Sequence, residues 1–415
     1  MTISHRGALR ESERCLQCHD APCTAACPAH INIPGFIIAL RSGNIRGAAE
    51  EVRSANAFAN VCGKVCPQEV FCQSVCLRAK QDSPVAIREL HFFATQWEAE
   101  HGFSVPRLPG ATGKRVAVIG GGPAGFACAF GLVQRGISVN LFDRVTPGGV
   151  PRNSIPAFRL GDKEVESDTT FLSRFITITL GEITPFRFDE LCADHDAVFV
   201  GVGLGRDRRL TIPGEELPGV IPVLRFLERA KSGDVVIRPG TRVVVVGGGN
   251  VSLDAAATAK RLGAEEVIVI YRRGVHEMRV WKAEMEEARR LGVTVRFFTA
   301  PVAVPGQTTV EGVRCCQTRL TDETDATGRR LPVVVPGSEF DVRADYVVVA
   351  IGQEPAAGFL HRLDRTPRGY VKVDAGLRTS LTGVYAGGDV VSGEGTIVEA
   401  VAQGADAARV IAASL

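Results

Sequence analysis

The sequence predicts an α/β fold in which a helical, cysteine-rich N-terminal domain precedes two Rossmann-like domains, the second inserted in the first. Two strand–glycine turn–helix–strand units start at Arg115 and Arg242, and a third apolar strand that ends in a Gly-Gly-Asp turn starts at Val384. Alternating strands and helices of this kind build parallel sheets that helices cover on both faces. Eight of the twelve cysteines lie in the first 76 residues, before the first of these units.

Length and charge narrow the class of protein. At about 150 residues per domain, 415 residues predict two to three domains. The net charge of +2 is too balanced for a protein whose main ligand is a polyanion. No stretch approaches the roughly 18 uninterrupted apolar residues of a membrane helix, and the N-terminus lacks the basic-then-apolar order of a secretion signal. We therefore expect a cytoplasmic protein that binds neither nucleic acid nor a membrane.

The N-terminal region is expected to consist of short helices. One is predicted from Gly43, and a longer one from Ser83 to about Glu100, because Ser-Pro before a periodic run is a helix-start signal. The segment Gly102–Arg115 is rich in Gly and Pro and leads into an apolar strand. A domain boundary is therefore expected near residue 112.

The eight N-terminal cysteines form two groups. The spacing is C-x2-C-x4-C-x3-C-P in the first and C-x3-C-P-x4-C-x3-C in the second; the members are Cys15, Cys18, Cys23 and Cys27, then Cys62, Cys66, Cys72 and Cys76. Eight thiols suit two [4Fe-4S] clusters, and in ferredoxin-like runs the last Cys before Pro binds the neighbouring cluster. In a reducing compartment such crowding favours metal over disulfides. Two zinc sites are the alternative, although zinc usually takes paired C-x2-C motifs.

His91 lies on the helix expected after the second cysteine group. A lone His on an apolar helix face is more often a packed core residue than a ligand. Imidazole can nevertheless replace a thiolate on a cluster, and it raises the cluster's potential. The sequence alone leaves both roles open for His91.

The first glycine turn follows a strand and opens a helix of small residues. Its G-x-G-x-x-G motif contains Gly120, Gly122, Pro123, Ala124 and Gly125. The next strand ends at Asp143, in place to bind a ribose hydroxyl while the helix N-terminus faces a pyrophosphate. The alternative is a glycine-rich turn in a sheet that binds no ligand. The combination of strand, turn, helix and terminal acid predicts a dinucleotide site.

The second glycine turn is followed by a strand that ends in basic residues instead of an acid. The turn contains Gly247, Gly249, Asn250 and Val251, with Ser252 at the third glycine position. The strand that follows ends at Arg272-Arg273 rather than at an acid, with Arg279 shortly after. An acid favours the free ribose hydroxyl of NAD, whereas guanidinium groups suit the 2′-phosphate of NADP. A solvated basic patch is the alternative for these arginines.

The last glycine turn precedes the C-terminal helix. Its Gly388-Asp389 step could place a carboxylate on a flavin ribityl hydroxyl, and the helix that opens near Thr396 could stabilise negative charge on a reduced flavin. No C-x-x-C pair lies near either nucleotide turn, which argues against a dithiol relay. The chain is therefore expected to transfer electrons.

These motifs resemble the iron–sulfur flavoprotein family that includes the glutamate synthase small subunit and the N-terminal half of dihydropyrimidine dehydrogenase. The resemblance covers essentially the whole chain: the cysteine spacing, GGGPAG at Gly120, IPAFRL at Ile155, GGGNVSLDAA at Gly247, VIYRRG at Val269, VAIGQEP at Val349 and AGGDVV at Ala386. The chain looks most like the PreT-type subunit of bacterial NAD-dependent dihydropyrimidine dehydrogenase, because its length leaves no room for a flavin-mononucleotide barrel.

The resemblance implies a glutathione-reductase-like arrangement of three domains. These are a helical iron–sulfur domain (1–112), an FAD-binding domain (113–239 and 345–415) and an NAD(P)-binding domain (240–344). The implied FAD contacts are Asp143, where the family usually has Glu, with Gly149, Arg159, Gly388, Asp389 and Thr396. The implied NAD(P) contacts are Asn250, Val251, Arg272, Arg273, Arg279 and Gly352.

The resemblance also divides the cluster ligands. One cluster would be held by Cys15, Cys18, Cys23 and Cys76, and the other by Cys27, Cys66, Cys72 and a fourth ligand that is not cysteine. The family's dehydrogenases have Gln at this fourth position, where the present chain has His91. Cys62 is the competing candidate.

The resemblance implies an electron-input subunit. A hydride from NAD(P)H would pass to FAD, and electrons would pass through two [4Fe-4S] clusters to a catalytic partner in a hetero-oligomer, with no catalytic side chain in the hydride step. The expected partner is an FMN-containing barrel protein that reduces uracil or thymine. A glutamate synthase small-subunit role is one alternative, and a zinc-binding scaffold with vestigial nucleotide folds is another. The PreT-type resemblance suggests NAD and the arginine pair suggests NADP.

Overall fold

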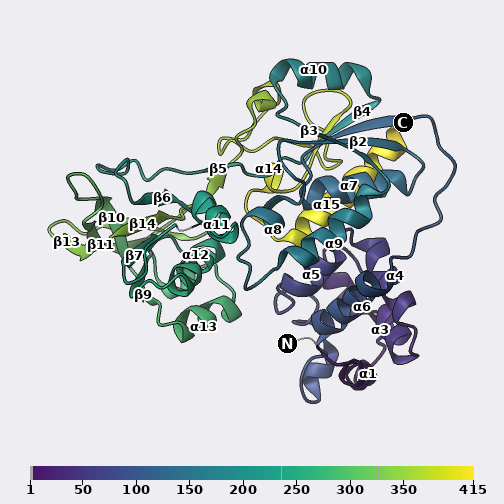
Figure 1. Cartoon of the computed structure of the whole chain (residues 1–415), viewed down its shortest axis with the longest axis horizontal. Helices are drawn as coiled ribbons and strands as arrows, with labels where there is room; N and C mark the ends of the chain where they lie inside the picture. The colour runs from purple at the N-terminus through teal and green to yellow at the C-terminus, as the bar shows by residue number, and fades with distance from the viewer. Residues whose placement is uncertain (1–2, 235, 326–327) are drawn as a thin grey trace. The chain divides into compact units, whose positions relative to one another are not determined.

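The computed structural model describes residues 3–234, 236–325 and 328–415 (Figure 1). The chain divides into two compact units, which are described separately. The first unit comprises the residues up to Arg152 together with Ala157–Gly205 and Glu354–Leu415. The second comprises Asn153–Pro156 and Arg206–Gln353, so it is an insertion in the first.

The N-terminal part of the first unit is helical, as the sequence predicts. Its helices are α1 (His5–Glu13), α2 (Pro22–Ala26), α3 (Ile33–Arg41), α4 (Ile45–Ala55), α5 (Ala59–Val65), the 3₁₀ helix η1 (Leu77–Lys80) and α6 (Ile87–His101). The side chains of Asn32 and Asn44 cap α3 and α4 by accepting from backbone N–H groups. Helix α6 begins at Ile87, later than expected. Just before it, the Ala86 N–H donates to Glu11 and the Val85 N–H to Cys76.

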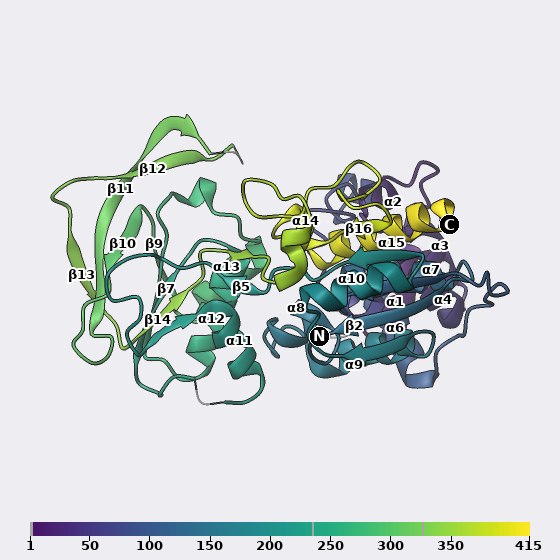
Figure 2. The ribbon, with the colours of Figure 1, turned by 90° about the horizontal axis from the view of Figure 1, so that it is seen from above.

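The rest of the first unit contains a parallel sheet with strand order β16-β4-β1-β2-β3. The strands are β1 (Arg115–Ile119), β2 (Ser138–Asp143), β3 (Thr177–Leu180), β4 (Ala197–Val200) and β16 (Val384–Ala386). The helices are α7 (Pro123–Val133), α8 (Gly149–Asn153), α9 (Asp162–Ser173), α10 (Pro185–Asp194), η3 (Gly358–Arg362), α14 (Asp389–Ser392) and α15 (Ile397–Ser414). Helices α7 and α15 lie side by side in Figures 1 and 2. The two helices are in close contact at Gly404, where any Cβ atom would lie only 2.1 Å from the Ala124 carbonyl oxygen, so this position requires glycine.

The second unit contains another parallel sheet, with strand order β6-β14-β7-β8-β9. Its strands are β6 (Val220–Pro222), β7 (Arg242–Val246), β8 (Glu266–Ile270), β9 (Thr294–Arg296) and β14 (Tyr346–Val349). Its helices are α11 (Val223–Lys231), α12 (Asn250–Arg261), η2 (Val275–Glu277) and α13 (Lys282–Arg290). The apolar runs of β7 and β8 are buried, as a parallel sheet covered on both faces requires. The predicted fold class is confirmed.

An antiparallel sheet, which the sequence analysis does not anticipate, completes the second unit. It is formed by β10 (Thr299–Ala303), β11 (Gly312–Thr324), β12 (Arg330–Val334) and β13 (Phe340–Arg343). A short pair, β5 (Arg206–Asp207) and β15 (Gln353–Glu354), lies where the chain enters and leaves the unit. Strands β6 and β14, which lie on either side of the segment 240–344, belong to the parallel sheet of this unit.

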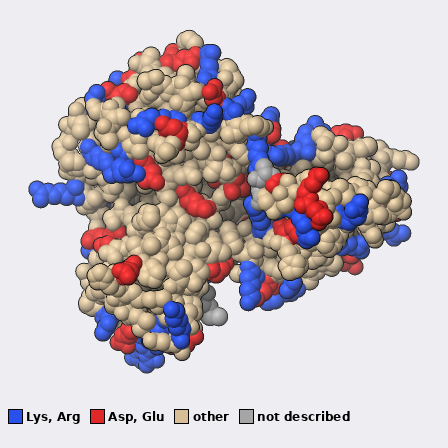
Figure 3. Space-filling model, turned by 180° about the vertical axis from the view of Figure 1, so that it is seen from behind, with Lys and Arg blue, Asp and Glu red and all other residues tan. Residues whose placement is uncertain are grey.

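The surface carries charges of both signs. Figure 3 shows Lys and Arg interspersed with Asp and Glu on the face in view, in keeping with the net charge of +2. Across the part of the chain that the structure describes, no helix combines the length and the apolar composition needed to span a membrane.

Candidate functional site

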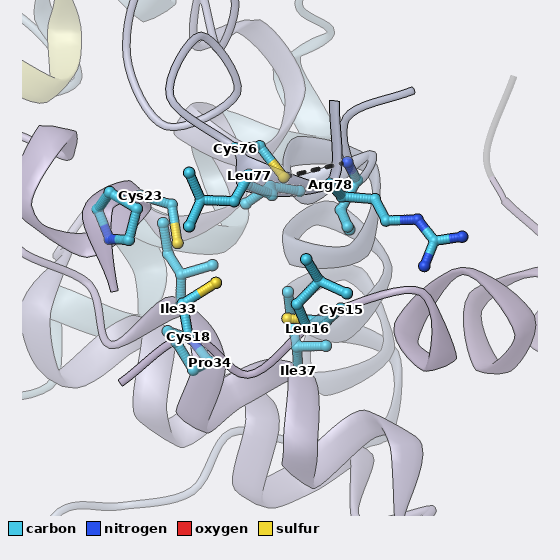
Figure 4. A pocket seen from close by; sticks show the side chains of 13 residues that line it. Cys15, Leu16, Cys18, Cys23, Ile33, Pro34, Ile37, Cys76, Leu77 and Arg78 are labelled. Carbon is cyan, nitrogen blue, oxygen red and sulfur yellow. Dashed lines mark hydrogen bonds between the residues drawn. The ribbon is translucent and has the colours of Figure 1, made fainter. Parts of the chain in front are cut away.

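Cysteines from both sequence groups line one pocket in the N-terminal domain (Figure 4). They are Cys15, Cys18, Cys23 and Cys76, and the remaining lining residues include Leu16, Ile33, Ile37 and Leu77. The Cys76 sulfur accepts a 3.5 Å hydrogen bond from the Val85 backbone N–H. These are the cysteines that the family resemblance assigns to one cluster, and the pocket brings the distant Cys76 to the other three.

Burial makes two of these thiols, Cys15 and Cys23, poor anions without a metal. It raises the pKa of Cys23 to about 11, and the pKa of Cys15 is raised by burial and by the nearby Cys18 and Cys76. A cationic cluster would offset this cost, because metal binding removes the thiol proton. Among the described residues, no three His, Cys, Asp or Glu side chains are arranged to hold a single metal ion. Four thiols around one pocket are the donor set that a [4Fe-4S] cluster needs.

The other N-terminal cysteines form a second group beside α5. Cys66 follows this helix, and burial, together with the nearby Cys62 and Cys27, raises its pKa. Burial also raises the pKa of Cys72, with further contributions from Cys66 and Cys27. Cys27, Cys66 and Cys72, with Cys62 beside them, are thus close enough to influence one another, as ligands of a second cluster would be.

His91 is buried on α6, and one ring nitrogen is conspicuously unused. The ring has a hydrogen bond with the backbone of Ala59, while Nε2 has no hydrogen-bond partner among the described residues. Burial lowers the pKa of His91 to about 4, so the imidazole is neutral. A neutral ring that uses one nitrogen on the backbone and keeps the other free is typical of a metal ligand.

The packing of α5 on α6 places His91 near the second cysteine group. Gly63, one residue after Cys62, is so close to α6 that a Cβ would lie 2.9 Å from the Phe92 Cα atom. Burial, with a smaller contribution from the nearby Asp168 carboxylate, raises the pKa of Cys62 to about 12. A thiolate at Cys62 would be close to that negative charge, whereas the imidazole of His91 adds none.

The first glycine turn has the shape of a pyrophosphate site. A Cβ at Gly120 would lie 2.5 Å from the Gly201 carbonyl oxygen, and one at Gly125 would lie 1.8 Å from the Gly120 oxygen. Close backbone packing therefore requires these two glycines. The middle one, Gly122, is different: its nearest described neighbour is the Gly149 Cα atom at 3.8 Å. The open space beside the α7 N-terminus, where Pro123 is the first residue, is where a phosphate would lie.

The other residues predicted to contact FAD lie in the same unit. The Asp143 carboxylate accepts from the Gly121 N–H at 2.7 Å and the Val145 N–H at 3.2 Å, which fixes it beside the turn. Arg159 is partly buried in the loop between α8 and α9. The structure therefore brings the end of β2 to the glycine turn, as the sequence predicts.

The Gly-Gly-Asp turn packs against the start of α7. A Cβ at Gly388 would lie 2.8 Å from the Ala124 Cβ atom, and the Gly388 N–H donates to Gln403 at 2.7 Å. Burial and two nearby glutamates raise the pKa of Asp389 to about 7. Thr396 caps α15. The turns at Gly122, Gly149 and Gly388 thus surround the α7 N-terminus, and they fit an FAD.

The second glycine turn, in the other unit, has the same arrangement of a tightly packed first glycine and an unobstructed middle glycine. A Cβ at Gly247 would lie 2.2 Å from the Ala350 carbonyl oxygen, whereas no described atom lies within 4 Å of a Cβ at Gly249. Ser252, at the third glycine position, donates its hydroxyl to the Gly249 carbonyl at 2.6 Å. The open space again lies at a helix N-terminus, that of α12. This turn fits a dinucleotide pyrophosphate.

The segment after β8 folds back over this second turn. Asn250 accepts from the Trp281 N–H at 2.9 Å, and Arg279 forms a backbone bridge with Gly249. Val251 is partly buried on α12, and Gly352 lies in the loop that follows β14. The predicted NAD(P) contacts Asn250, Arg279 and Gly249 are thus brought together.

The two arginines at the end of this strand have different environments. Arg272 is exposed. Arg273 is buried, and its guanidinium donates to the Arg330 carbonyl at 2.9 Å and to Asp325 at 2.8 Å. Sequence reasoning does not find Asp325, because it lies 52 residues away in the unanticipated antiparallel sheet. Sequence reasoning does not single out Gly201 either, although a glycine-rich run after an apolar strand is a signal for it.

Two family models match the chain. Residues 114–404 match the pyridine nucleotide-disulphide oxidoreductase family, and residues 1–103 match the dihydropyrimidine dehydrogenase domain II, 4Fe-4S cluster. Together they include both glycine turns and all eight N-terminal cysteines.

Similar proteins are subunits or chains of several oxidoreductases. The NADP(+)-dependent formate dehydrogenase subunit beta of Moorella thermoacetica is 37% identical over 94% of this chain and 59% of its own length. The glutamate synthase [NADPH] small chain of Escherichia coli K12 is 34% identical over 98% of this chain and 91% of its own. The NAD-dependent dihydropyrimidine dehydrogenase subunit PreT of the same strain is 34% identical over 97% and 93%. The chain thus spans little more than half of the first relative and nearly all of the other two.

Solved structures share the two-domain nucleotide-binding fold. Mycobacterium tuberculosis FprA in complex with NADPH aligns with a TM-score of 0.62 at 20% identity, over 72% of this chain and 84% of FprA. At this identity the match concerns the fold alone.

Proposed function

The chain belongs to the pyridine nucleotide-disulphide oxidoreductase family, together with the glutamate synthase small chain and PreT, and from this premise we propose that it is the electron-input subunit of a larger enzyme. It is an oxidoreductase whose cofactors are FAD, NAD(P)H and 4Fe-4S iron–sulfur. FAD, when bound, converts a two-electron hydride into single electrons, which the clusters carry one at a time. The larger enzyme would be a hetero-oligomer.

One observation carries the proposal: the thiol-rich domain and the flavin turn belong to one compact unit. Phe58, at the start of α5, packs on Phe126 of α7 with 5.8 Å between the ring centroids. Helix α5 leads to Cys66, and α7 opens at the flavin turn. A direct contact between the elements that hold the two cofactors supports electron transfer between them, because such transfer depends on proximity.

The proposal also divides the cluster ligands into two groups. We assign Cys15, Cys18, Cys23 and Cys76 to one [4Fe-4S] cluster, and Cys27, Cys66, Cys72 and His91 to the other. The shared pocket supports the first set. The unpartnered Nε2 atom of His91 supports its choice over Cys62 for the second.

The side chains position the cofactors and take no covalent part. In the proposal, the open space at Gly122 and the α7 N-terminus bind the FAD pyrophosphate, and Asp143 binds a ribose hydroxyl. The turn at Gly249 binds the pyrophosphate of NAD(P)H, with Arg279 beside it. Hydride transfer needs no acid or base from the protein, so precise placement is the main contribution of the chain.

The partner is proposed from the relatives. PreT is a dihydropyrimidine dehydrogenase subunit by name, and by this likeness the partner would be an FMN-containing barrel protein that reduces uracil or thymine. The glutamate synthase small chain has the same percentage identity, so a glutamate-forming partner is the second candidate. Purification of the tagged chain from its own cells, with identification of the co-purifying subunit, distinguishes the two.

An anaerobic titration tests the electron path. The protein is purified without oxygen, its iron, sulfide and flavin are measured, and NADH or NADPH is added while absorbance is followed. Loss of both the flavin bands and the broad cluster absorbance is expected. Bleaching of the flavin alone would place the clusters outside the path. A colourless protein containing zinc would support the scaffold alternative instead.

A further inference from the structure

The β11–β12 hairpin holds an arginine that the sequence assigns to nucleotide binding. Arg273 donates through Nε to the Arg330 carbonyl and through Nη2 to the Asp325 carboxylate, and its side chain is only 3% exposed. We propose that Asp325 is a specificity-determining residue, which lowers the preference for NADPH by withholding Arg273 from the adenosine 2′-phosphate. The inference rests on the proposed use of NAD(P)H.

The position of Arg273 makes it a candidate ligand of the adenosine 2′-phosphate. In this kind of fold the residues at the end of the second strand face the adenosine ribose. Arg272 and Arg273 follow β8, and the segment then returns to the glycine turn, where Arg279 bridges to Gly249. Arg272 and Arg279 are exposed there. Arg273, by contrast, is buried beneath the hairpin.

Several contacts hold the β11–β12 hairpin against the segment that follows β8. Arg330 pairs with Glu277 at 2.8 Å, and the Thr318 hydroxyl donates to the Arg272 carbonyl at 2.8 Å. Together with the bonds of Arg273, these contacts fix the hairpin over the segment. Asp325 is therefore held in place and does not approach Arg273 by chance.

The chemistry of the pair opposes phosphate binding in two ways. A guanidinium recognises a phosphate through two parallel N–H groups, and Arg273 already uses Nε and Nη2. The Asp325 carboxylate also carries a negative charge close to the place that a 2′-phosphate would occupy, and like charges repel. NADH lacks this phosphate, so neither effect reduces its binding.

The test uses the complete chain with its cofactors and two matched substitutions. Asp325→Asn removes the charge that holds Arg273. Asp322→Asn removes a charge from an exposed position of the same hairpin. Binding of adenosine 2′,5′-bisphosphate and of adenosine 5′-diphosphate is measured by calorimetry, and the apparent KM of NADPH and NADH is measured by flavin reduction.

The expected result is selective. Asp325→Asn should tighten binding of the 2′,5′-bisphosphate by about tenfold, as one charged hydrogen bond would provide. Its affinity for the 5′-diphosphate and its KM for NADH should stay within about twofold. The Asp322→Asn variant should bind both nucleotides like the unmodified chain. No selective gain, or an equal gain in the Asp322→Asn variant, would overturn the inference.

A second substitution keeps the test decisive if Asp325→Asn does not fold. Arg272→Ala in the unmodified chain should weaken the 2′,5′-bisphosphate about tenfold, whereas Arg273→Met should not weaken it. Equal weakening by the two would show that Arg273 already reads the phosphate, and the inference would be wrong. Failure of the unmodified chain to bind or oxidise either nucleotide would instead contradict the proposed function.

Discussion

The carboxylate of Asp168 lies 3.1 Å from the guanidinium of Arg53, and both side chains are buried. Arg53 is on α4 of the N-terminal domain and also pairs with Glu98 at 2.7 Å. Asp168 is on α9, in the part of the unit that contains the flavin turn, and it accepts from the Asn60 and Val61 N–H groups at the start of α5. A single carboxylate therefore fixes the helix that leads to Cys66 against the flavin-binding part.

Loss of this carboxylate should destabilise the protein strongly. We expect Asp168→Asn to lower the free energy of unfolding by about 3–5 kcal/mol, because it leaves the buried Arg53 charge incompletely compensated. Urea unfolding of the complete chain measures this. Lys163→Gln is the control, since Lys163 pairs with Glu100 between the same two parts but both side chains are exposed. That change should cost at most about 1 kcal/mol. Equal losses would mean that burial of the pair is unimportant.

Replacement of His91 should remove one cluster and leave the other. His91→Ala is expected to lower the iron content by about half, because a [4Fe-4S] cluster needs four ligands. His91→Cys should restore the iron and lower the potential of that cluster, since a thiolate replaces a neutral imidazole. Iron analysis and a redox titration followed by electron paramagnetic resonance measure both effects.

The control for this experiment is the competing ligand. Cys62→Ser should retain all the iron and the spectrum of the unmodified chain. If Cys62→Ser loses the iron while His91→Ala keeps it, Cys62 is the ligand and the assignment of His91 is wrong.

Two glycines of the flavin turn should respond differently to alanine. A Cβ at Gly122 would meet only the Gly149 Cα atom, at 3.8 Å, so Gly122→Ala should fold. It should lose flavin, because the methyl group occupies the proposed place of the pyrophosphate. A Cβ at Gly125 would lie 1.8 Å from the Gly120 carbonyl oxygen, so Gly125→Ala should destabilise the fold itself. Flavin content and circular dichroism distinguish the two. Normal flavin content in Gly122→Ala would contradict the assigned binding position.

The sequence predicts those parts of the site that depend on neighbours along the chain. The turn at Gly120 is recognisable because its glycine spacing is local: Gly125 packs on the Gly120 carbonyl oxygen, five residues earlier. Asp143 follows from the length of one helix and strand. The partition of the cysteines is less accessible, because Cys76 reaches the pocket of Cys15 only through the packing of the helices. Spacing alone cannot indicate that.

The environment of Arg273 also depends on a residue that is distant in the sequence. The dipeptide with Arg272 suggests two arginines for the 2′-phosphate of NADP, but Arg273 is buried and paired with Asp325, 52 residues later. Nothing near the arginines in sequence indicates this partner, because β11 and β12 belong to a sheet that the alternation of strands and helices does not predict. Long-range ion pairs of this kind need the structure.

Asp389 should make the stability of the flavin-free protein depend on pH. Burial and two nearby glutamates raise its pKa from 3.8 to about 7 in the folded chain, so its protonated form favours folding. The contribution is fully present below about pH 4 and is lost as the pH rises through about 7. It is at most about 4 kcal/mol, because each pKa unit corresponds to about 1.4 kcal/mol.

An uncharged amide at this position should remove that dependence. We expect Asp389→Asn to lose less stability than the unmodified chain between about pH 4 and pH 8, since the amide does not ionise and no charge is buried at the higher pH. Urea unfolding of the flavin-free protein at both pH values measures the difference. Asp406→Asn, which changes an exposed carboxylate on α15, should behave like the unmodified chain. If Asp389→Asn also behaves like the unmodified chain, the carboxylate is already ionised in the folded protein at neutral pH, and its burial has no energetic consequence there.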